Sequence, residues 1–451
     1  MKFVTIVAKN YLAGARVLAH SLRAHEGARL VVVVADLGAD DGFHDDDFDV
    51  VVPARLPIPA GELQRMALLY TVTEFSTALK PFALQWLLDE GADSAVYLDP
   101  DMVLYAPLAG LRDHLASAQV VLTPHVLHPM PRDGKETSEY TLRRCGIFNL
   151  GFLGVSRRGR VFLDWFGERL LRDAISDPVQ MLYTDQKWAD WVPSLFDTHV
   201  WRDPGVNVAY WNLHERHPAV DSGGAVSCLG RPLRLFHFSG FDPARPEVFS
   251  SRPGETYRVQ DVPPSVRALS EAYAAAMQAA GSAEGRALPY GFAATPHGYV
   301  LPVPTRRHAR DETLRAEAAG TALPPSPFDD EAAFANWLAE MVPCAQAEAP
   351  RALAIGVAVV TAAPAADAPE GLLHAWLTGE YGAGELQRYD EWAATLGLPA
   401  LVVPPLPAAA PAETAATAVE QQAAGQPAQA AQADGVARRA SRLASRIIRR
   451  D

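Results

Sequence analysis

The sequence predicts an α/β fold in which helices cover both faces of a mostly parallel sheet. Over residues 1–242, short apolar, β-branched runs alternate with segments whose apolar residues recur at helical spacing. This alternation is typical of strand–helix–strand units. Residues 30–35 are apolar throughout, as expected of a strand that is buried on both faces. Sheets of this kind bind ligands at the carboxyl ends of their strands, so polar residues that follow strands are candidate site residues.

The same periodicities locate the individual elements. Strands are expected at residues 3–7, 30–35, 94–98, 119–123, 151–155 and 233–238. Helices are expected at residues 11–25, 61–70, 75–88 and 161–172. Trp188 and Trp191, spaced i and i+3, are expected to pack in the core rather than to stack on a sugar.

Changes in composition divide the chain into four regions. Residues 1–262 are expected to form the sheet domain, and residues 263–403 a small, mainly helical accessory domain. Residues 404–435 are mostly Ala, Pro, Gln and Glu, which is typical of a disordered linker. In residues 436–451, apolar residues and arginines segregate to opposite sides of a helix, a pattern typical of an interfacial helix on an anionic membrane. A solvated tail or a partner-binding helix is the alternative for this last segment.

The chain of 451 residues is acidic, with a formal net charge of −13. Binding to nucleic-acid phosphates relies on clustered Lys and Arg, so this balance disfavours a nucleic-acid partner. The three cysteines (Cys145, Cys228 and Cys344) lie far apart, which argues against a disulfide framework or a zinc site and suits a reducing compartment. The sequence shows neither a signal peptide nor a membrane-spanning stretch. We therefore expect a cytoplasmic protein that contacts a membrane only peripherally, at its inner face.

Two carboxylates, Asp99 and Asp101, follow the strand expected at residues 94–98 and are separated by Pro100. Carboxylate oxygens at this position suit a hard divalent cation that bridges phosphates. An Asp-x-Asp sequence can also cap a turn. The apolar runs on both sides favour the metal site, because ionised groups beside a core need a partner.

Residues 97–103, Tyr-Leu-Asp-Pro-Asp-Met-Val, resemble the metal motif of the GT-A-fold glycosyltransferases. The likeness is closest to family 8, the group of glycogenin and the bacterial lipooligosaccharide galactosyltransferases. Further segments between residues 2 and 242 match in the family's order, and residues 288–292 and 326–338 resemble extensions of multi-domain bacterial polysaccharide enzymes. The resemblance implies the GT-A fold of nucleotide-diphospho-sugar transferases.

The resemblance also implies a donor-binding set. Asn10 and Tyr11 stand as in the family's first-strand loop, Asp36 corresponds to the acid beside the nucleoside, and residues 148–152 are similar to the segment that contacts the donor sugar. The residues implied to bind the donor are Val7, Ala8, Asn10, Tyr11, Asp36, Asn149 and Gly151. Taken without the resemblance, Asn10 could cap the following helix and Gly151 could only permit close strand packing.

Metal ligands and catalytic residues follow from the same resemblance. His237 corresponds to the third protein ligand beside Asp99 and Asp101, and the implied cofactor is Mn²⁺ or Mg²⁺. The implied catalytic residues are Lys80, which assists the leaving diphosphate, and Asp185 and Gln186, which flank the reacting sugar carbon. Each has a structural alternative: His237 could be a core histidine, Lys80 a solvated helix residue and Asp185 a helix N-cap.

The implied activity is transfer of a hexose from a nucleotide sugar, UDP-linked, to a saccharide or lipid-linked acceptor, with retention of anomeric configuration. Such a reaction would belong to surface polysaccharide or lipopolysaccharide synthesis. Residues 124–144 and 203–212 are expected on the acceptor side, with core packing as the alternative for the latter. Two other functions remain open: a nucleotidyltransferase on a related fold and a non-catalytic saccharide-binding protein. The first is disfavoured because no glycine-rich loop follows the first strand.

Overall fold

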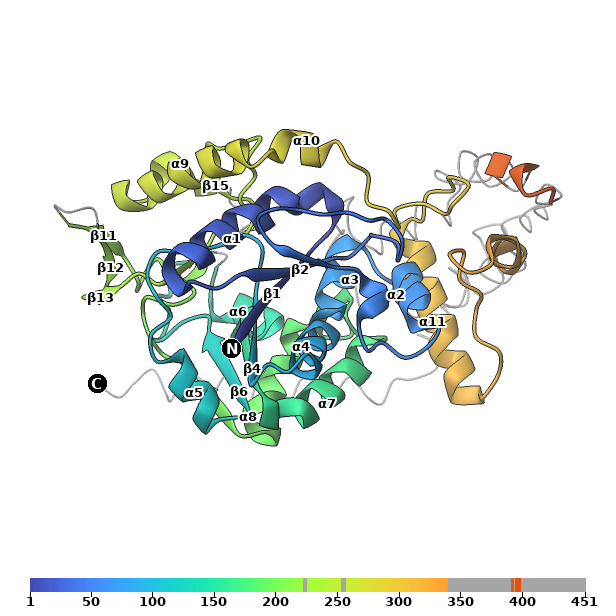
Figure 1. Cartoon of the computed structure of the whole chain (residues 1–451), viewed down its shortest axis with the longest axis horizontal. Helices are drawn as coiled ribbons and strands as arrows, with labels where there is room; N and C mark the ends of the chain where they lie inside the picture. The colour runs from blue at the N-terminus through green and yellow to red at the C-terminus, as the bar shows by residue number, and fades with distance from the viewer. Residues whose placement is uncertain (136, 222–224, 253–256, 340–390, 393, 399–451) are drawn as a thin grey trace, which may run out of the picture.

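The computed structural model describes residues 1–135, 137–221, 225–252, 257–339, 391–392 and 394–398. Its centre is a seven-stranded sheet with the order β10-β6-β7-β4-β1-β2-β3, in which β7 alone is antiparallel to its neighbours. The predicted α/β class with a mostly parallel sheet is thus confirmed (Figure 1). The linker expected at 404–435 and the helix expected at 436–451 lie outside the described residues.

Every expected strand is present, with small shifts at the ends. The strands of the large sheet are β1 (Lys2–Val7), β2 (Leu30–Val34), β3 (Asp49–Val51), β4 (Ser94–Leu98), β6 (Val120–Pro124), β7 (Phe148–Ser156) and β10 (Thr198–Val200). The smaller sheets pair β5 (Met102–Leu104) with β14 (Leu235–His237), β8 (Ser176–Asp177) with β9 (Leu182–Tyr183), β15 (Val248–Ser250) with β16 (Tyr257–Arg258), and β11 (Pro218–Val220) with β12 (Val226–Cys228) and β13 (Arg231–Pro232). The short edge strands β3 and β10 were not expected, because three residues carry too little periodicity.

The helices of the sheet region are α1 (Leu12–Glu26), α2 (Glu62–Leu69), α3 (Val72–Ala78), α4 (Lys80–Asp89), α5 (Leu111–Ser117), α6 (Glu139–Cys145), α7 (Arg160–Leu170) and α8 (Val192–Leu195). The single helix expected at 75–88 is wrong, because α3 ends at Ala78 and α4 begins at Lys80. Pro81 lies in the first turn of α4, where its missing N–H costs no intrahelical hydrogen bond. Trp188 packs against the core, but Trp191 is 60% exposed, so the core prediction for Trp191 is wrong.

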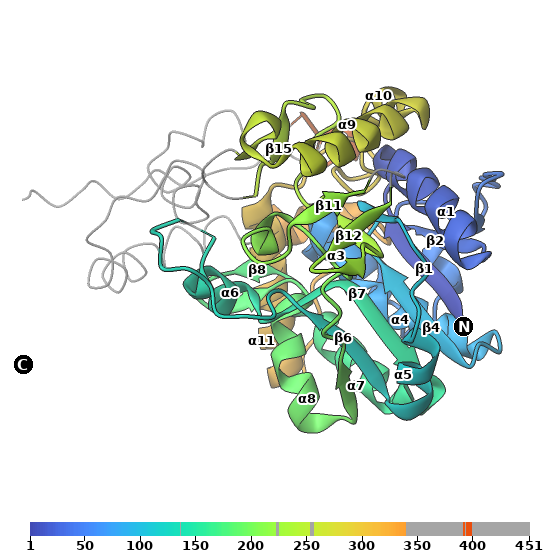
Figure 2. The ribbon, with the colours of Figure 1, turned by 90° about the vertical axis from the view of Figure 1, so that its left-hand side faces the viewer.

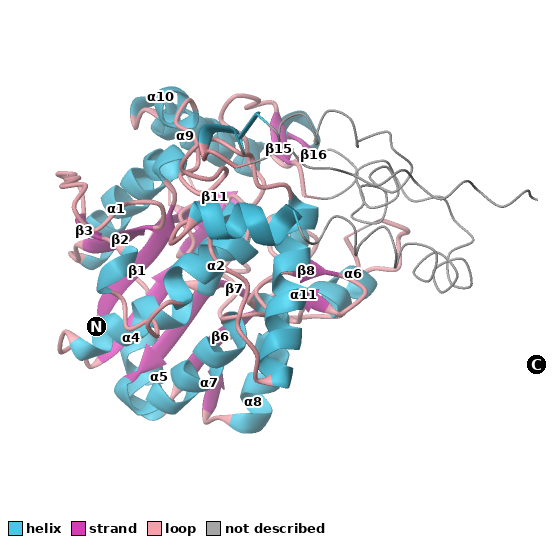
Figure 3. Ribbon diagram, turned by 90° about the vertical axis from the view of Figure 1, so that its right-hand side faces the viewer, coloured by secondary structure: helices cyan, strands magenta, loops and turns pink. Residues whose placement is uncertain are grey.

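Alternating side chains of the strands feed two cores, one on each face of the sheet. On β1, Val4 and Ile6 join α2, α3, α4 and α7, whereas Phe3 and Val7 join α1 and α5. This alternation follows from the two-residue period of a strand, and it produces a three-layer arrangement. Figure 3 shows the strands between the two helical layers. Among the described residues, no helix is both long and apolar enough to cross a bilayer.

The chain after residue 262 wraps two sides of this unit. Helices α9 (Pro264–Ala279) and α10 (Ser282–Arg286) lie along α1, and α11 (Val303–Ala319) packs against α2 (Figure 1). Buried Arg306 of α11 donates hydrogen bonds of 2.8–3.0 Å to the carbonyls of Ala67, Leu68 and Tyr70, which end α2. The guanidinium thus satisfies carbonyls that have no partner within their own helix. The described part is mainly helical, and the domain boundary at 262/263 stays a prediction.

Candidate functional site

Strand pairing brings His237 to the two carboxylates. Asp99 and Asp101 lie in the turn between β4 and β5, and β14 pairs antiparallel with β5 so that His237 stands opposite Met102. The Nε2 atom of His237 lies 3.0 Å from Asp101 Oδ1 and 3.8 Å from Asp99 Oδ2. A carboxylate oxygen of Asp99, a carboxylate oxygen of Asp101 and a ring nitrogen of His237 lie within 4.8 Å of one another.

These residues fit a hard divalent cation. Asp101 Oδ1 is buried and accepts no hydrogen bond from any described residue. His237 Nδ1 lies 3.3 Å from Asn207 Oδ1, and a proton on Nδ1 leaves the Nε2 lone pair facing Asp101. Two acceptors 3.0 Å apart match neighbouring ligands of an octahedral ion with bonds of about 2.1 Å. Burial opposes protonation of His237, but Asp101 outweighs it and raises the pKa of His237, so a metal and a proton compete for the same atom.

Lys80 places a fixed positive charge beside these ligands. Its side chain is 2% exposed, so the solvated-helix alternative is wrong. Lys80 Nζ lies 2.8 Å from Asp185 Oδ2 and 3.6 Å from Asp99 Oδ1, and donates a 2.9 Å hydrogen bond to the Leu150 carbonyl. Burial alone would lower the pKa of Lys80, but Asp185 and Asp99 outweigh it and raise the pKa. The ammonium therefore stays charged at neutral pH.

The carboxylate of Asp185 is used for this pair and not for capping. Asp185 precedes a short 3-10 helix (Gln186–Trp191), yet its side chain makes no capping hydrogen bond, so the N-cap interpretation is wrong. Thr184 Oγ1 donates a 3.1 Å hydrogen bond to Asp185 Oδ1. The next residue, Gln186, accepts a hydrogen bond of 3.1 Å from Asn149 Nδ2 and donates one of 3.0 Å to the Cys145 carbonyl. Both predicted catalytic side chains are therefore held in place.

A chain of buried amides joins His237 to Gln186. Asn207 donates through Nδ2 to Asn149 Oδ1 at 2.9 Å, and its own Oδ1 faces His237 Nδ1. Asn149 in turn donates to Gln186. Asn207 has a φ of +58°, a left-handed conformation that Asn tolerates better than most residues. The connected order is His237, Asn207, Asn149 and Gln186.

Gly151 is required by the closeness of His237. A Cβ atom on Gly151 would lie 2.6 Å from His237 Cε1 and 2.6 Å from the Met102 side chain. The glycine therefore permits more than strand-to-strand packing, because any side chain here would press on His237. The Gly151 carbonyl also accepts a 2.8 Å hydrogen bond from the Asp99 backbone.

Two residues of this network were missed by the sequence interpretation. Thr123 Oγ1 accepts a 2.9 Å hydrogen bond from Asn207 Nδ2, and His125 lies 3.5 Å from Asn149 Nδ2 through its Nε2. Burial lowers the pKa of His125 to about 4, so its ring is neutral. Both residues lie at or just beyond the strand expected at 119–123. The rule that flagged Asp99 would therefore also have flagged them.

The first-strand loop lies beside the same site. Asn10 lies inside a 3-10 turn (Lys9–Tyr11), and neither that turn nor α1 has a side-chain N-cap, so the capping interpretation of Asn10 is wrong. Burial, and next the charge of Asp101, raise the pKa of Tyr11. The carbonyls of Val7 and Ala8 are engaged, because they accept backbone hydrogen bonds of 2.7 Å from Ala35 and 2.9 Å from Tyr11.

Asp36 stands apart from the metal ligands, at the end of β2. It is 5% exposed, and both of its oxygens accept backbone hydrogen bonds. The Lys9 amide donates to Oδ1 at 2.8 Å, and the Gly291 amide donates to Oδ2 at 2.9 Å. Segment 288–292, which resembles a polysaccharide-enzyme extension, therefore contacts the predicted nucleoside acid directly.

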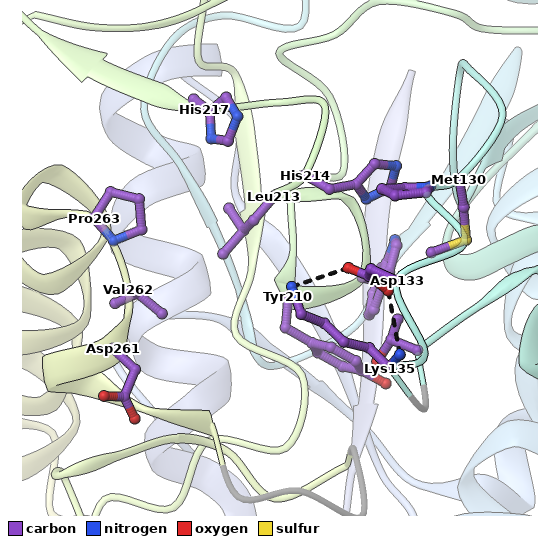
Figure 4. A pocket seen from close by; sticks show the side chains of 13 residues that line it. Met130, Asp133, Lys135, Tyr210, Leu213, His214, His217, Asp261, Val262 and Pro263 are labelled. Carbon is purple, nitrogen blue, oxygen red and sulfur yellow. Dashed lines mark hydrogen bonds and ion pairs between the residues drawn. The ribbon is translucent and has the colours of Figure 1, made fainter.

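Figure 4 shows a pocket of about 210 Å³ that is reached from the His237 side of the site only through Trp211, one of its lining residues. Three segments contribute its lining residues, which are Met130, Pro131, Asp133, Lys135, Thr137, Tyr210, Trp211, Leu213, His214, His217, Asp261, Val262 and Pro263. Trp211, one of the lining residues, has its ring 5.2 Å from the His237 ring in an edge-to-face arrangement. Trp211 Nε1 and His214 Nε2 are buried and have no hydrogen-bond partner among the described residues. The pocket therefore has an aromatic wall that contacts His237.

Comparison with known proteins gives limited matches. No family model matches the chain. The "Uncharacterized protein YfnF" of Bacillus subtilis is 28% identical over 174 residues, which are 38% of this chain and 57% of that protein. The chain thus spans 57% of the length of this curated relative.

Three similar solved structures are glycosyltransferases by their descriptions. The galactosyltransferase LgtC, in complex with donor and acceptor sugar analogs, has 16% identity and a TM-score of 0.36, covering 62% of this chain and 96% of LgtC. An active-site mutant of LgtC has 18% identity and a TM-score of 0.33, with coverages of 52% and 86%. A glycosyltransferase involved in the glycosylation of the major capsid of PBCV-1 has 10% identity and a TM-score of 0.30, with coverages of 54% and 96%. Function is therefore inferred from the geometry of the site.

Proposed function

We propose that the chain is a metal-dependent GT-A glycosyltransferase that transfers a hexose from a UDP-sugar to a saccharide or lipid-linked acceptor. The observation that carries the proposal is the clustering of Asp99, Asp101 and His237 beside the buried cation of Lys80. This cluster lies at the carboxyl end of a parallel sheet, where such folds bind ligands.

The leaving group of the reaction is a nucleoside diphosphate, and its negative charge grows as the sugar departs. A divalent cation held by Asp99, Asp101 and His237 would neutralise part of this charge. Lys80 supplies a second positive charge, 3.6 Å from Asp99 Oδ1, and its burial strengthens the interaction because water is excluded. Asp185 holds the ammonium in position at 2.8 Å.

The donor sugar is assigned to the side of the Asp99–Asp101–His237 cluster on which the amide side chains of Asn149 and Gln186 lie. Asn149 and Gln186 are fixed by mutual hydrogen bonding, and preorganised polar groups of this kind stabilise a transition state without reorganising. Gln186 and Asp185 would flank the oxocarbenium-like carbon. By the family resemblance, the acceptor hydroxyl attacks from the side of the leaving group and the configuration is retained.

The acceptor is assigned to the pocket that is lined by Trp211, whose ring contacts the ring of His237. Carbohydrates present apolar ring faces to aromatic side chains and hydroxyl groups to unpaired donors and acceptors. Trp211 and His214 line this pocket, and burial lowers the pKa of His214 and keeps its ring neutral. A saccharide here would place a hydroxyl group next to the His237 side of the cluster.

The alternatives predict different sites. A nucleotidyltransferase needs a loop after the first strand that cradles a triphosphate, whereas here a single 3-10 turn (Lys9–Tyr11) leads directly into α1. A decayed saccharide-binding protein predicts a broken ligand set, whereas all three metal-ligand residues are present and adjacent.

The decisive experiment is hydrolysis and transfer with a panel of nucleotide sugars. We expect a UDP-hexose to be consumed with Mn²⁺ present, and EDTA or the Asp99→Ala/Asp101→Ala variant to stop the reaction. NMR of the product's anomeric proton would report retention, and an inverted product would remove the family 8 mechanism. Consumption that is equal with and without the metal and both carboxylates would contradict the proposed site.

A further inference from the structure

We propose that one exposed surface of the protein docks on an anionic lipid bilayer. The surface consists of Tyr140, Arg143 and Arg144 on α6, and Val179 and Met181 in the turn between β8 and β9. We call it the α6–hairpin surface. It deepens the proposed function by assigning a lipid-linked saccharide as acceptor, and to that extent it rests on that function.

The surface holds the most exposed large apolar side chains of the described residues. Tyr140 is 79% exposed, Val179 78% and Met181 71%. The two elements that carry them are in contact with each other, and Figures 2 and 3 show α6 and β8 together at one edge of the molecule. Single exposed apolar residues are common, but three together at one edge mark an interaction site.

Basic residues share the same helix face. Tyr140, Arg143 and Arg144 are spaced i, i+3 and i+4 on α6 and all three are exposed, whereas Leu142 is buried against the protein. The ion pairs of the described residues include neither arginine, although Glu139, four residues before Arg143, is also exposed on α6. In a protein with a net charge of −13, two exposed arginines beside apolar side chains favour an anionic surface as partner.

The hairpin holds its apolar tips out toward solvent. Asp177 Oδ1 accepts hydrogen bonds from the Val179 amide at 2.8 Å and the Gln180 amide at 3.1 Å. Met181 has a φ of +54°, a left-handed conformation that a long side chain adopts at an energetic cost. The turn therefore presents Val179 and Met181 to solvent, where the apolar part of a bilayer interface could cover them.

Helix α6 and the β8–β9 hairpin support the predicted catalytic residue Gln186 and border the pocket. Cys145, the last residue of α6, accepts the hydrogen bond from Gln186 through its carbonyl and bonds to Tyr183 of β9 through its side chain. The pocket loop runs into α6, and Glu139 accepts a 3.2 Å hydrogen bond from the Met130 amide. A bilayer against this surface would therefore lie next to the acceptor pocket, where the saccharide of a lipid-linked acceptor must enter.

The test is co-sedimentation of the full chain with vesicles of phosphatidylcholine and phosphatidylglycerol in equal amounts, and with phosphatidylcholine alone. The variants are Tyr140→Ser/Val179→Ser/Met181→Ser and Arg143→Gln/Arg144→Gln. The matched control is Val220→Ser/Val300→Ser, because these valines are 49% and 59% exposed on other elements. All are made in the native chain and in a chain whose six arginines within 436–451 are changed to glutamine, so that the predicted terminal helix is tested separately.

We expect each surface variant to bind the anionic vesicles about tenfold more weakly or worse in both backgrounds, with the control unchanged. Hydrolysis of the nucleotide sugar in solution should stay at the native level, which separates a failure of this inference from a failure of the proposed function. Equal binding of native, surface-variant and control proteins in either background would overturn the inference. Loss of binding in the surface variants on phosphatidylcholine alone, without a difference on anionic vesicles, would also overturn it.

Discussion

Two acidic residues that follow strands of this sheet share one sequence pattern, but the hydrogen bonding around them differs. Asp36 follows β2 and Asp99 follows β4, each after an uninterrupted buried strand. Both oxygens of Asp36 accept backbone amides. At the end of β4, the buried Oδ1 of the neighbouring Asp101 faces His237 Nε2 at 3.0 Å rather than a backbone amide, and Lys80 Nζ lies 3.6 Å from Asp99 Oδ1.

We propose that the difference separates an acid that mainly supports the fold from one that mainly binds a ligand. Each oxygen of Asp36 already accepts one backbone amide, which leaves fewer acceptor sites for a ligand. A buried carboxylate oxygen without a backbone donor is stabilised by a nearby positive charge, either a metal ion or a protonated His237. An acid that follows a strand is therefore a candidate site residue, and the hydrogen bonds that its oxygens already accept indicate how much of it is available to a ligand.

The strongest way to break this comparison is to exchange the two acids for their amides. Asp101→Asn keeps the shape but loses the charge that holds a cation, so we expect metal-dependent UDP-sugar turnover to fall about a thousandfold. Turnover with a Mn²⁺ titration is the measurement, and Asp36→Asn is the matched control. Similar losses in both variants would show that the two acids do not differ as described.

Lys80→Met tests the buried cation. It removes a charge from the leaving-group side and leaves Asp185 buried without its counter-ion, so we expect turnover to fall a hundredfold or more and the free energy of unfolding to drop by about 3–5 kcal/mol. Urea unfolding and turnover of the same sample provide both values. Arg29→Met is the control, because the Arg29–Asp49 ion pair is exposed and should cost under about 1 kcal/mol. A Lys80→Met protein as stable as the control would contradict the buried pair.

Asn207→Gly sharpens the comparison by testing what supports His237. Glycine accepts the φ of +58° without strain, so the variant removes the amide and leaves the backbone conformation available. We expect Mn²⁺ affinity to fall about 10–100-fold, since the partner that orients a metal-ligating histidine is lost. Manganese binding without any sugar, followed by electron paramagnetic resonance, reads this out directly. An unchanged affinity would mean that His237 is oriented by packing alone.

Asp36→Asn should have the smallest effect on transfer. The amide group of Asn cannot accept hydrogen bonds from both Lys9 and Gly291, so we expect a loss of about 1–3 kcal/mol in stability and a change in turnover of no more than a few-fold. Urea unfolding and the Michaelis constant for the nucleotide sugar are the measurements. A large rise in that constant with unchanged stability would restore Asp36 as a nucleoside ligand.

Much of the fold follows from local periodicity. Residues 94–98 were expected as a strand and form β4 with the same bounds, because four apolar residues in a row after Ser94 give a clear signal. The break between α3 and α4 was missed although Pro81 lies there, because a proline early in a helix and a proline that ends one have similar sequences. The contact of Gly291 with Asp36 could not be predicted, since the two residues are 255 positions apart.

Within the site, the sequence predicted which residues take part, but it did not predict all of the contacts between them. Asp99, Asp101 and His237 were expected to form one group and do lie together. Lys80 and Asp185 were expected separately, and only the folded chain shows that they form an ion pair. The role of Asn207 depends on a left-handed backbone and on partners from three other segments, which no local pattern encodes.

The hydrogen bonds from Arg306 to the carbonyls at the end of α2 affect how the protein folds during translation. Ala67 and its partner Arg306 are separated by 239 residues, so α2 emerges long before the group that completes it. Until then its terminal carbonyls must bind water, and the helix can reach its final packing only late in translation. Folding of the sheet that bears the site is therefore completed by one of its latest-made helices, and premature termination before Arg306 would leave an incompletely packed chain.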